Sequence, residues 1–167
     1  FVDACDFSAD MLKVASRKKH TPNLFLRSLT EDFGEENYDL LLLLFDSINY
    51  LTKEGDISLL LSNVAKALRE NGIFVFDIST IFNTEENFDG YVNIKDKENI
   101  FITQESDFSR RKRIQQNKVT IYEKDGCFHR RYQEVHKQMI YRTSEIISLI
   151  SASGLTLKGI HAIGDSR

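Results

Sequence analysis

The spacing of apolar residues changes along this chain and divides it into three regions. Up to residue 80, short apolar runs alternate with segments in which apolar residues recur at helical spacing. Between residues 98 and 141, apolar and polar residues alternate, which is typical of half-buried strands. One helical and one apolar segment follow residue 142. We therefore expect an α/β domain interrupted by an antiparallel insert.

The first region predicts four strands and two helices. The strands are expected at 1–6, 24–26, 38–45 and 73–78, and the third, apolar on both faces, is typical of a central parallel strand. Ser8 is a suitable N-cap for the first helix, which would turn its apolar side chains inward: Met11, Leu12, Val14 and Ala15. The second helix, 57–68, has apolar residues at i, i+3, i+4 and i+7, with Gly72 as its C′ residue. Strands alternating with helices imply a parallel sheet covered by helices on both faces.

The insert is expected to begin irregularly and then to form a meander. Residues 81–97 are polar and predict a linker, followed by strands at 98–108, 112–123 and 127–141. Asp125-Gly126 predicts a tight hairpin between the last two strands. Thr143 would then cap a helix that ends at Gly154, before a final strand at 155–163.

Composition describes one soluble globular domain. The 167 residues are 41% hydrophobic and 28% charged, and the longest apolar run, 40–45, is too short to cross a membrane. A net charge of −3 gives no case for a nucleic-acid or membrane partner, and 110–113 predicts a solvated basic turn more readily than a nucleic-acid contact. Cys5 and Cys127 form neither a metal-ligand pattern nor a disulfide framework, so we expect a cytoplasmic protein without a metal site.

Carboxylates follow three of the predicted strands, where ligands bind in open parallel sheets. They are Asp6, Asp46 and Asp77. A carboxylate such as Asp6 can accept hydrogen bonds from both ribose hydroxyls of a nucleotide, although position alone favours a solvated loop aspartate beside the Ser8 cap. The chain contains no GxG or GxxxxGK[ST] phosphate-binding loop.

Four segments, in this order and spacing, resemble class I S-adenosylmethionine-dependent methyltransferases. Asp6 to Leu12 (DFSADML) resembles the D-x-S-x-x-M-L segment of that family, and 38–51 resembles its fourth strand and the following loop. Residues 68–77 resemble its stretch into the fifth strand. Residues 134–141 (EVHKQMIY) are similar to the E-x-H-x-Q-R-x-Y pattern of a subgroup that includes amino-sugar N-methyltransferases. The family's glycine-rich loop would precede Phe1, so we expect the chain to be an internal piece of a longer protein.

The resemblance implies a Rossmann-like methyltransferase sheet in 1–80 and 142–167, with 81–141 as a linker and β-insert covering the substrate site. It implies S-adenosylmethionine as cofactor. Asp6 would bind the ribose, and Phe7 and Met11 the adenine, unless the latter two are core residues. The other implied contacts are backbone groups of Leu29 and Thr30 at the adenine edge, where the family often has an acidic residue, and Phe45 and Asp46 at the methionine end.

His136 is the candidate catalytic residue. Strand periodicity places Tyr132, Glu134 and His136 on one face of the last insert strand, so His136 could accept a proton from the substrate with Glu134 tuning its basicity. A histidine bonded only to its neighbours on the sheet surface is the alternative. Tyr50 and Tyr132 are the other candidate substrate contacts.

These features predict methyl transfer to a nitrogen or oxygen of a small molecule by in-line displacement. The alternative is a non-catalytic ligand- or protein-binding domain on the same scaffold. A nucleic-acid methyltransferase would need a far larger basic face than 110–113. A homodimer is left open.

Overall fold

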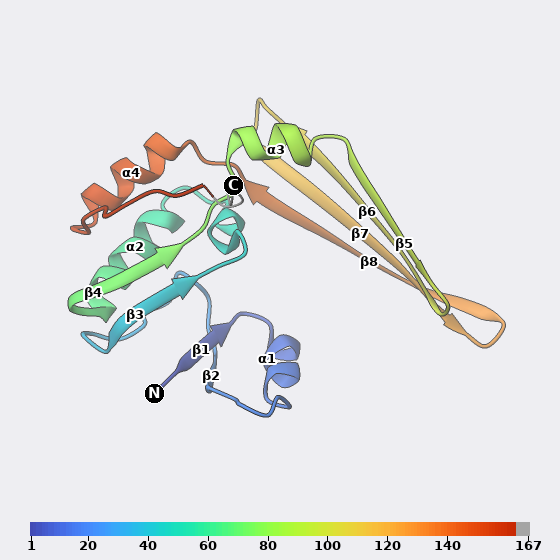
Figure 1. Cartoon of the computed structure of the whole chain (residues 1–167), viewed down its shortest axis with the longest axis horizontal. Coiled ribbons are helices and arrows are strands. Elements are labelled where there is room, and N and C mark those ends of the chain that lie inside the picture. The colour runs from blue at the N-terminus through green and yellow to red at the C-terminus, as the bar shows by residue number, and fades with distance from the viewer. Residues whose placement is uncertain (163–167) are drawn as a thin grey trace.

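A computed structural model describes residues 1–162 (Figure 1). The first part of the chain alternates strands and helices. Its elements are β1 (Asp3–Asp6), α1 (Ala9–Ala15), β2 (Asn23–Leu26), β3 (Tyr38–Leu43), the 3₁₀ helix η1 (Ser47–Tyr50), α2 (Asp56–Ala67) and β4 (Leu68–Phe76). The remaining elements are α3 (Ile81–Asn87), β5 (Tyr91–Lys97), β6 (Ile100–Ser109), β7 (Ile114–Asp125), β8 (Phe128–Met139) and α4 (Thr143–Ala152).

The α/β region contains two parallel strand pairs. β1 pairs with β2, and β3 pairs with β4. The Tyr38 hydroxyl donates to Asp3 Oδ2 at 3.0 Å and joins the start of β3 to the start of β1. Helices α2 and α4 lie on one side of these strands and α1 on the other (Figure 1), so the predicted α/β fold with an antiparallel insert is confirmed.

Helix α2 supplies more of the core than any other described element, as its apolar spacing predicts. Its Leu60 and Leu61 are 1% and 0% exposed. They pack with Ile146 and Ile150 of α4, and the inward face of β3 and β4 closes the cluster from below: Leu41, Leu43, Phe74 and Phe76. This packing holds the carboxyl ends of β3 and β4 in place.

Two predictions of burial are wrong, and for β3 the reason is that no described element covers its other face. Leu40 and Leu42 are 52% and 58% exposed, so the leucine run is buried on one face only. Helix α1 contains no buried residue, and Met11 and Val14, expected inward, are 59% and 52% exposed.

Gly72 does not end a helix, contrary to prediction. Helix α2 ends at Ala67, and the left-handed residue beyond it is Asn71, with φ 64°. Gly72 lies within β4, where a Cβ atom would come within 3.1 Å of the Tyr38 carbonyl oxygen. Glycine therefore suits the close approach of β3 near the register shift between Tyr38 and Leu40, where a side chain would have to push its neighbours aside by a few tenths of an ångström.

The insert forms one antiparallel sheet in the order β5-β6-β7-β8. Strands β6 to β8 and the Asp125-Gly126 hairpin confirm the prediction. The expected irregular stretch 81–97 is instead α3 and β5. The overlooked signal was Thr80, whose Oγ1 accepts from the Asn83 N–H at 3.2 Å and caps α3.

The end of the chain differs from prediction in two details. The N-cap of α4 is Arg142 rather than Thr143, and the Glu145 carboxylate accepts from the Arg142 N–H at 3.0 Å. Residues 155–162 form no strand, because no described strand pairs with them. Ile163 lies outside the described residues. No helix in residues 1–162 is long and apolar enough to cross a membrane.

Candidate functional site

The turn that follows β3 has an unusual backbone. Phe45 and Asp46 both adopt left-handed conformations, with φ 61° and 54°, which cost about 1–2 kcal/mol for residues other than glycine. The Asp77 carboxylate, which follows β4, accepts from the N–H groups of both residues at 3.1 Å each. One side chain from the neighbouring strand therefore holds the turn, and Phe45 remains 89% exposed beside it.

Negative charge is concentrated at this turn. Desolvation, followed by repulsion from Asp77, raises the pKa of the Asp46 carboxyl above its ordinary value. Burial, followed by the charge of Asp46, raises the pKa of the Tyr50 phenol, which therefore stays protonated at neutral pH. Two carboxylates and an aromatic ring beside the turn favour a cationic ligand group.

Tyr50 of η1 meets His136 of β8. The Tyr50 hydroxyl lies 3.4 Å from His136 Nδ1, and the two rings are edge to face with centroids 5.9 Å apart. Glu134 Oε2 lies 3.3 Å from the other ring nitrogen, Nε2. The tertiary structure thus brings Tyr50 to Glu134 and His136, from which it is more than eighty residues away in the sequence.

The two neighbours of His136 suit one tautomer. A protonated Tyr50 phenol can donate to Nδ1, and a proton on Nε2 can be donated to the Glu134 carboxylate. Nδ1 is then the basic atom of the ring. Because the 3.4 Å contact is long for an O–H donor, a ligand could displace the Tyr50 hydroxyl from it.

Asp6 closes a short turn at the carboxyl end of β1. Its Oδ1 accepts from the Ser8 N–H at 2.8 Å, and the Ser8 hydroxyl caps α1. Phe7 and Met11 are 79% and 59% exposed, so neither is a core residue in the described chain. Asp6 therefore has a fixed carboxylate beside two exposed apolar side chains.

Leu29 and Thr30 occupy the loop after β2. The Leu29 side chain packs against the core. The Thr30 carbonyl accepts from Asn63 Nδ2 at 3.1 Å, and the Thr30 N–H makes only a 3.4 Å contact with the Ser28 hydroxyl. The role of these backbone groups at an adenine edge stays a prediction.

No hydrogen bond joins Tyr132 to Tyr50, Glu134 or His136 in residues 1–162. It is 45% exposed, and its hydroxyl donates to Glu123 Oε2 at 3.4 Å. Tyr132 lies opposite Ile121 in the sheet, four residues before His136. Its role as a substrate contact stays a prediction.

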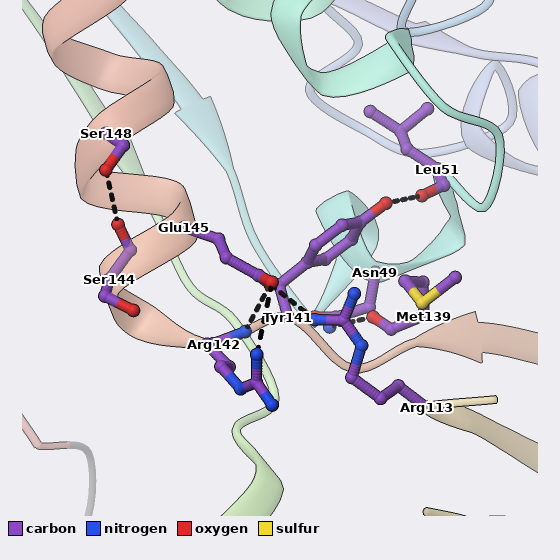
Figure 2. A network of polar contacts seen from close by, with 9 residues as sticks. All are labelled: Asn49, Leu51, Arg113, Met139, Tyr141, Arg142, Ser144, Glu145 and Ser148. Carbon is purple, nitrogen blue, oxygen red and sulfur yellow. Dashed lines mark hydrogen bonds and ion pairs between the residues drawn. The ribbon is translucent and has the colours of Figure 1, made fainter. Parts of the chain in front are cut away.

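Sequence reasoning missed Asn49, which is fully buried. It donates to the Met139 carbonyl at 2.8 Å (Figure 2). Its only sequence signal is an amide between apolar and aromatic neighbours, Ile48 and Tyr50. From the sequence, Asp77 was expected only as a carboxylate that follows a strand, and its hydrogen bonds to the turn after β3 were not predicted.

Further contacts anchor the insert to the core (Figure 2). Arg113, just before β7, forms a 2.5 Å ion pair with Glu145 of α4, and the Tyr141 hydroxyl donates to the Leu51 carbonyl. Arg110 pairs with Glu85 at 2.9 Å. Two of the four cations at 110–113 are thus engaged within the chain. Within residues 1–162, no three His, Cys, Asp or Glu side chains are grouped to hold a metal ion.

The chain is similar in sequence and in fold to known methyltransferases. A protein of Geobacillus sp. (strain WCH70), named only provisionally as a methyltransferase, is 25% identical over 166 residues, which is 96% of this chain and 67% of that protein. No protein-family model matches the chain.

Solved structures agree with this likeness. A S-adenosylmethionine-dependent methyltransferase from Clostridium acetobutylicum superposes with a TM-score of 0.79 at 23% identity, covering 90% of this chain and 62% of that one. CalS10, an amino pentose methyltransferase from Micromonospora echinaspora solved with S-adenosylmethionine bound, has a TM-score of 0.71 at 19% identity, covering 91% and 64%. The chain therefore has the fold of these methyltransferases and spans less than two thirds of each solved chain.

Proposed function

We propose that this chain takes part in S-adenosylmethionine-dependent methyl transfer to a nitrogen or oxygen of a small molecule. The observation that carries the proposal is the meeting of Tyr50, His136 and Glu134 beside the acidic turn at Phe45 and Asp46. The likeness to methyltransferases over nine tenths of the chain supports it.

The side chains present fit the cofactor chemically. The Asp6 carboxylate can accept from ribose hydroxyls, and the exposed Phe7 and Met11 offer apolar surface to an adenine ring. Asp46 supplies negative charge for the cationic methionine end, and Phe45 supplies an exposed aromatic ring. When bound, S-adenosylmethionine would supply a methyl group on a positively charged sulfur, open to in-line displacement.

The chain's own contribution is then orientation and proton transfer. Holding an acceptor in line can supply about 7–11 kcal/mol of the barrier reduction. His136 Nδ1 would take the proton that the acceptor loses, a smaller factor of about 10²–10⁴. Glu134 would stabilise the resulting imidazolium from the Nε2 side. In this proposal 81–141 covers the substrate, and Tyr132 contacts its distal part.

The first test is calorimetric titration of S-adenosylhomocysteine into the protein extended upstream of Phe1 to include the glycine-rich loop that the family resemblance implies, because a failure of residues 1–167 alone to bind would not test the assignment. Asp6→Ala should weaken binding at least about tenfold, or roughly 1.4 kcal/mol, whereas Asp6→Asn keeps an oxygen for the Ser8 N–H and isolates the loss of charge. Asp10→Ala, an acidic residue of the same segment, is the matched control. Unchanged affinity in both Asp6 variants would remove the ribose assignment.

The second test separates an enzyme from a non-catalytic binding domain. His136→Gln should abolish most methyl transfer to a panel of small amines and alcohols while leaving S-adenosylhomocysteine affinity unchanged. His129→Gln, on the same strand, is the control. Binding without transfer to any acceptor would favour the non-catalytic domain.

Two broader expectations belong to the same proposal. The exposed free thiols of Cys5 and Cys127 suit a reducing cytoplasm. A homodimer remains open, and sedimentation equilibrium of the chain would count its copies.

A further inference from the structure

We infer that Asn49 is a positioning residue that sets Tyr50 against His136; the inference rests on the function proposed above. Asn49 is 0% exposed and adjoins Tyr50 in η1. Its amide contacts two other segments, the loop after β4 and the end of β8. Asn49 thus joins η1, which contains Tyr50, to β8, which contains His136, and to the loop after β4.

The chemistry of the contacts requires an amide. Asn49 Nδ2 donates to the carbonyl oxygens of Met139 at 2.8 Å and Ser79 at 3.3 Å. Its Oδ1 accepts from the Ser79 N–H at 2.9 Å. Asparagine provides two donors and an acceptor from one planar group, whereas aspartate loses both donors and serine lacks the reach.

The contacts of Asn49 link its position to that of His136, the candidate base. Met139 follows His136 by three residues on β8, about 10 Å along a strand that β7 holds throughout its length. Tyr50 follows Asn49 directly, and the Asn49 N–H donates to the Asp46 carbonyl at 2.9 Å. Asn49 therefore fixes both members of the Tyr50–His136 contact, which at 3.4 Å is sensitive to small shifts.

A buried chain of side chains supports the same junction. The Ser79 hydroxyl contacts Thr84 Oγ1 at 3.2 Å, and Thr84 donates to Gln115 Oε1 at 3.0 Å. Gln115 then contacts Gln138 of β8 at 3.5 Å. Because Gln138 lies two residues from His136, the loop after β4 reaches β8 by a second route through α3.

Asn63 provides a matched contrast within the same molecule. It is also buried, at 6% exposure, and its Nδ2 also donates to two backbone carbonyls, Thr30 and Glu31, both at 3.1 Å. Asn63 holds the loop after β2, on the cofactor side of the proposed site. The same substitution at the two asparagines should therefore disturb different halves of the site.

The experiment compares Asn49→Ser and Asn49→Asp with Asn63→Ser and Asn63→Asp. The readout is the ¹⁵N resonance of His136 Nδ1, assigned among the chain's four histidines with His136→Gln, and Tyr50→Phe serves as reference for the lost contact. Both Asn49 variants should shift this resonance in the direction of Tyr50→Phe and leave S-adenosylhomocysteine affinity unchanged. The Asn63 variants should leave the resonance in place and weaken S-adenosylhomocysteine by about fivefold, as expected for a lost hydrogen bond.

Three outcomes would overturn the inference. The first is an unchanged His136 resonance in a folded Asn49 variant, and the second is an equal shift in the Asn63 variants, which would indicate general loosening. The third is failure of both Asn49 variants to fold while both Asn63 variants fold, which would make Asn49 a structural residue. The resonance needs no ligand, so failure of the unsubstituted protein, extended upstream of Phe1 as in the calorimetric test, to bind S-adenosylhomocysteine would count against the proposed function alone.

Discussion

Replacing Asp77 with asparagine would test whether one carboxylate holds the turn after β3. In the structure both carboxylate oxygens accept from backbone N–H groups, those of Phe45 and Asp46, at 3.1 Å. Asp77→Asn retains one oxygen and turns an NH₂ group toward the other N–H. The substitution therefore removes one charge-assisted hydrogen bond and weakens the second.

The expected magnitude follows from these contacts. A hydrogen bond to a charged group contributes about 1.5–3 kcal/mol. Solvent screening at the half-buried Asp77, and relief of its repulsion with Asp46, reduce the net loss. We expect the free energy of unfolding to fall by about 1–2 kcal/mol, with Tm falling by roughly 2–4 °C per kcal/mol for a domain of this size.

Urea unfolding followed by circular dichroism measures the loss, because the chain contains no tryptophan for fluorescence. The matched control is Asp39→Asn, which makes the same chemical change on β3. Asp39 is 83% exposed and, among residues 1–162, pairs only with the exposed Arg69, so its substitution should cost less than about 1 kcal/mol. Equal losses in the two variants would refute the clamping role of Asp77.

Three further predictions concern the core, the insert and pH. Leu61→Ala should lower the free energy of unfolding by about 2–5 kcal/mol, whereas Leu59→Ala, 47% exposed on the same helix, should change it little; equal urea midpoints would mean that the core face is misassigned. Ser106→Ala should leave the midpoint unchanged or raise it, because the buried Ser106 hydroxyl has no hydrogen-bond partner among residues 1–162, and a clear loss would contradict this account. The backbone N–H of Arg142, helped by Arg113, lowers the pKa of Glu145 below its ordinary value of 4.5, so its stabilisation is present above pH 4.5 and is lost as pH falls through the folded-state pKa. In Glu145→Gln, the free energy of unfolding should therefore fall less steeply than in the unsubstituted chain as pH is lowered below 4.5. An unchanged dependence on pH would contradict the contacts assigned to Glu145.

Local patterns in the sequence predicted most elements correctly. Helix α2 follows from apolar spacing, since burying one face of a helix requires a 3.6-residue period whatever lies opposite. The hairpin at Asp125-Gly126 follows from turn chemistry, because glycine adopts the required positive φ, here 63°, without strain.

Local patterns failed where a neighbour decided the outcome. The leucine run of β3 has the same composition whether one face or both are covered, and only the tertiary structure leaves Leu40 and Leu42 exposed. Gly72 has the position expected of a helix terminus, yet it lies in β4, where the close approach of the Tyr38 carbonyl is what favours a glycine.

The candidate site divides in the same way. Strand periodicity alone placed Glu134 beside His136, because side chains two residues apart share a face. The approach of Tyr50 to His136, the Asp77 clamp and the buried Asn49 depend on how η1, the loop after β4 and β8 pack together. The sequence thus determined which elements form and which side chains share a strand face, since those properties act over a few residues. Only the tertiary structure decided which loops meet, because those contacts join residues 30 to 90 positions apart.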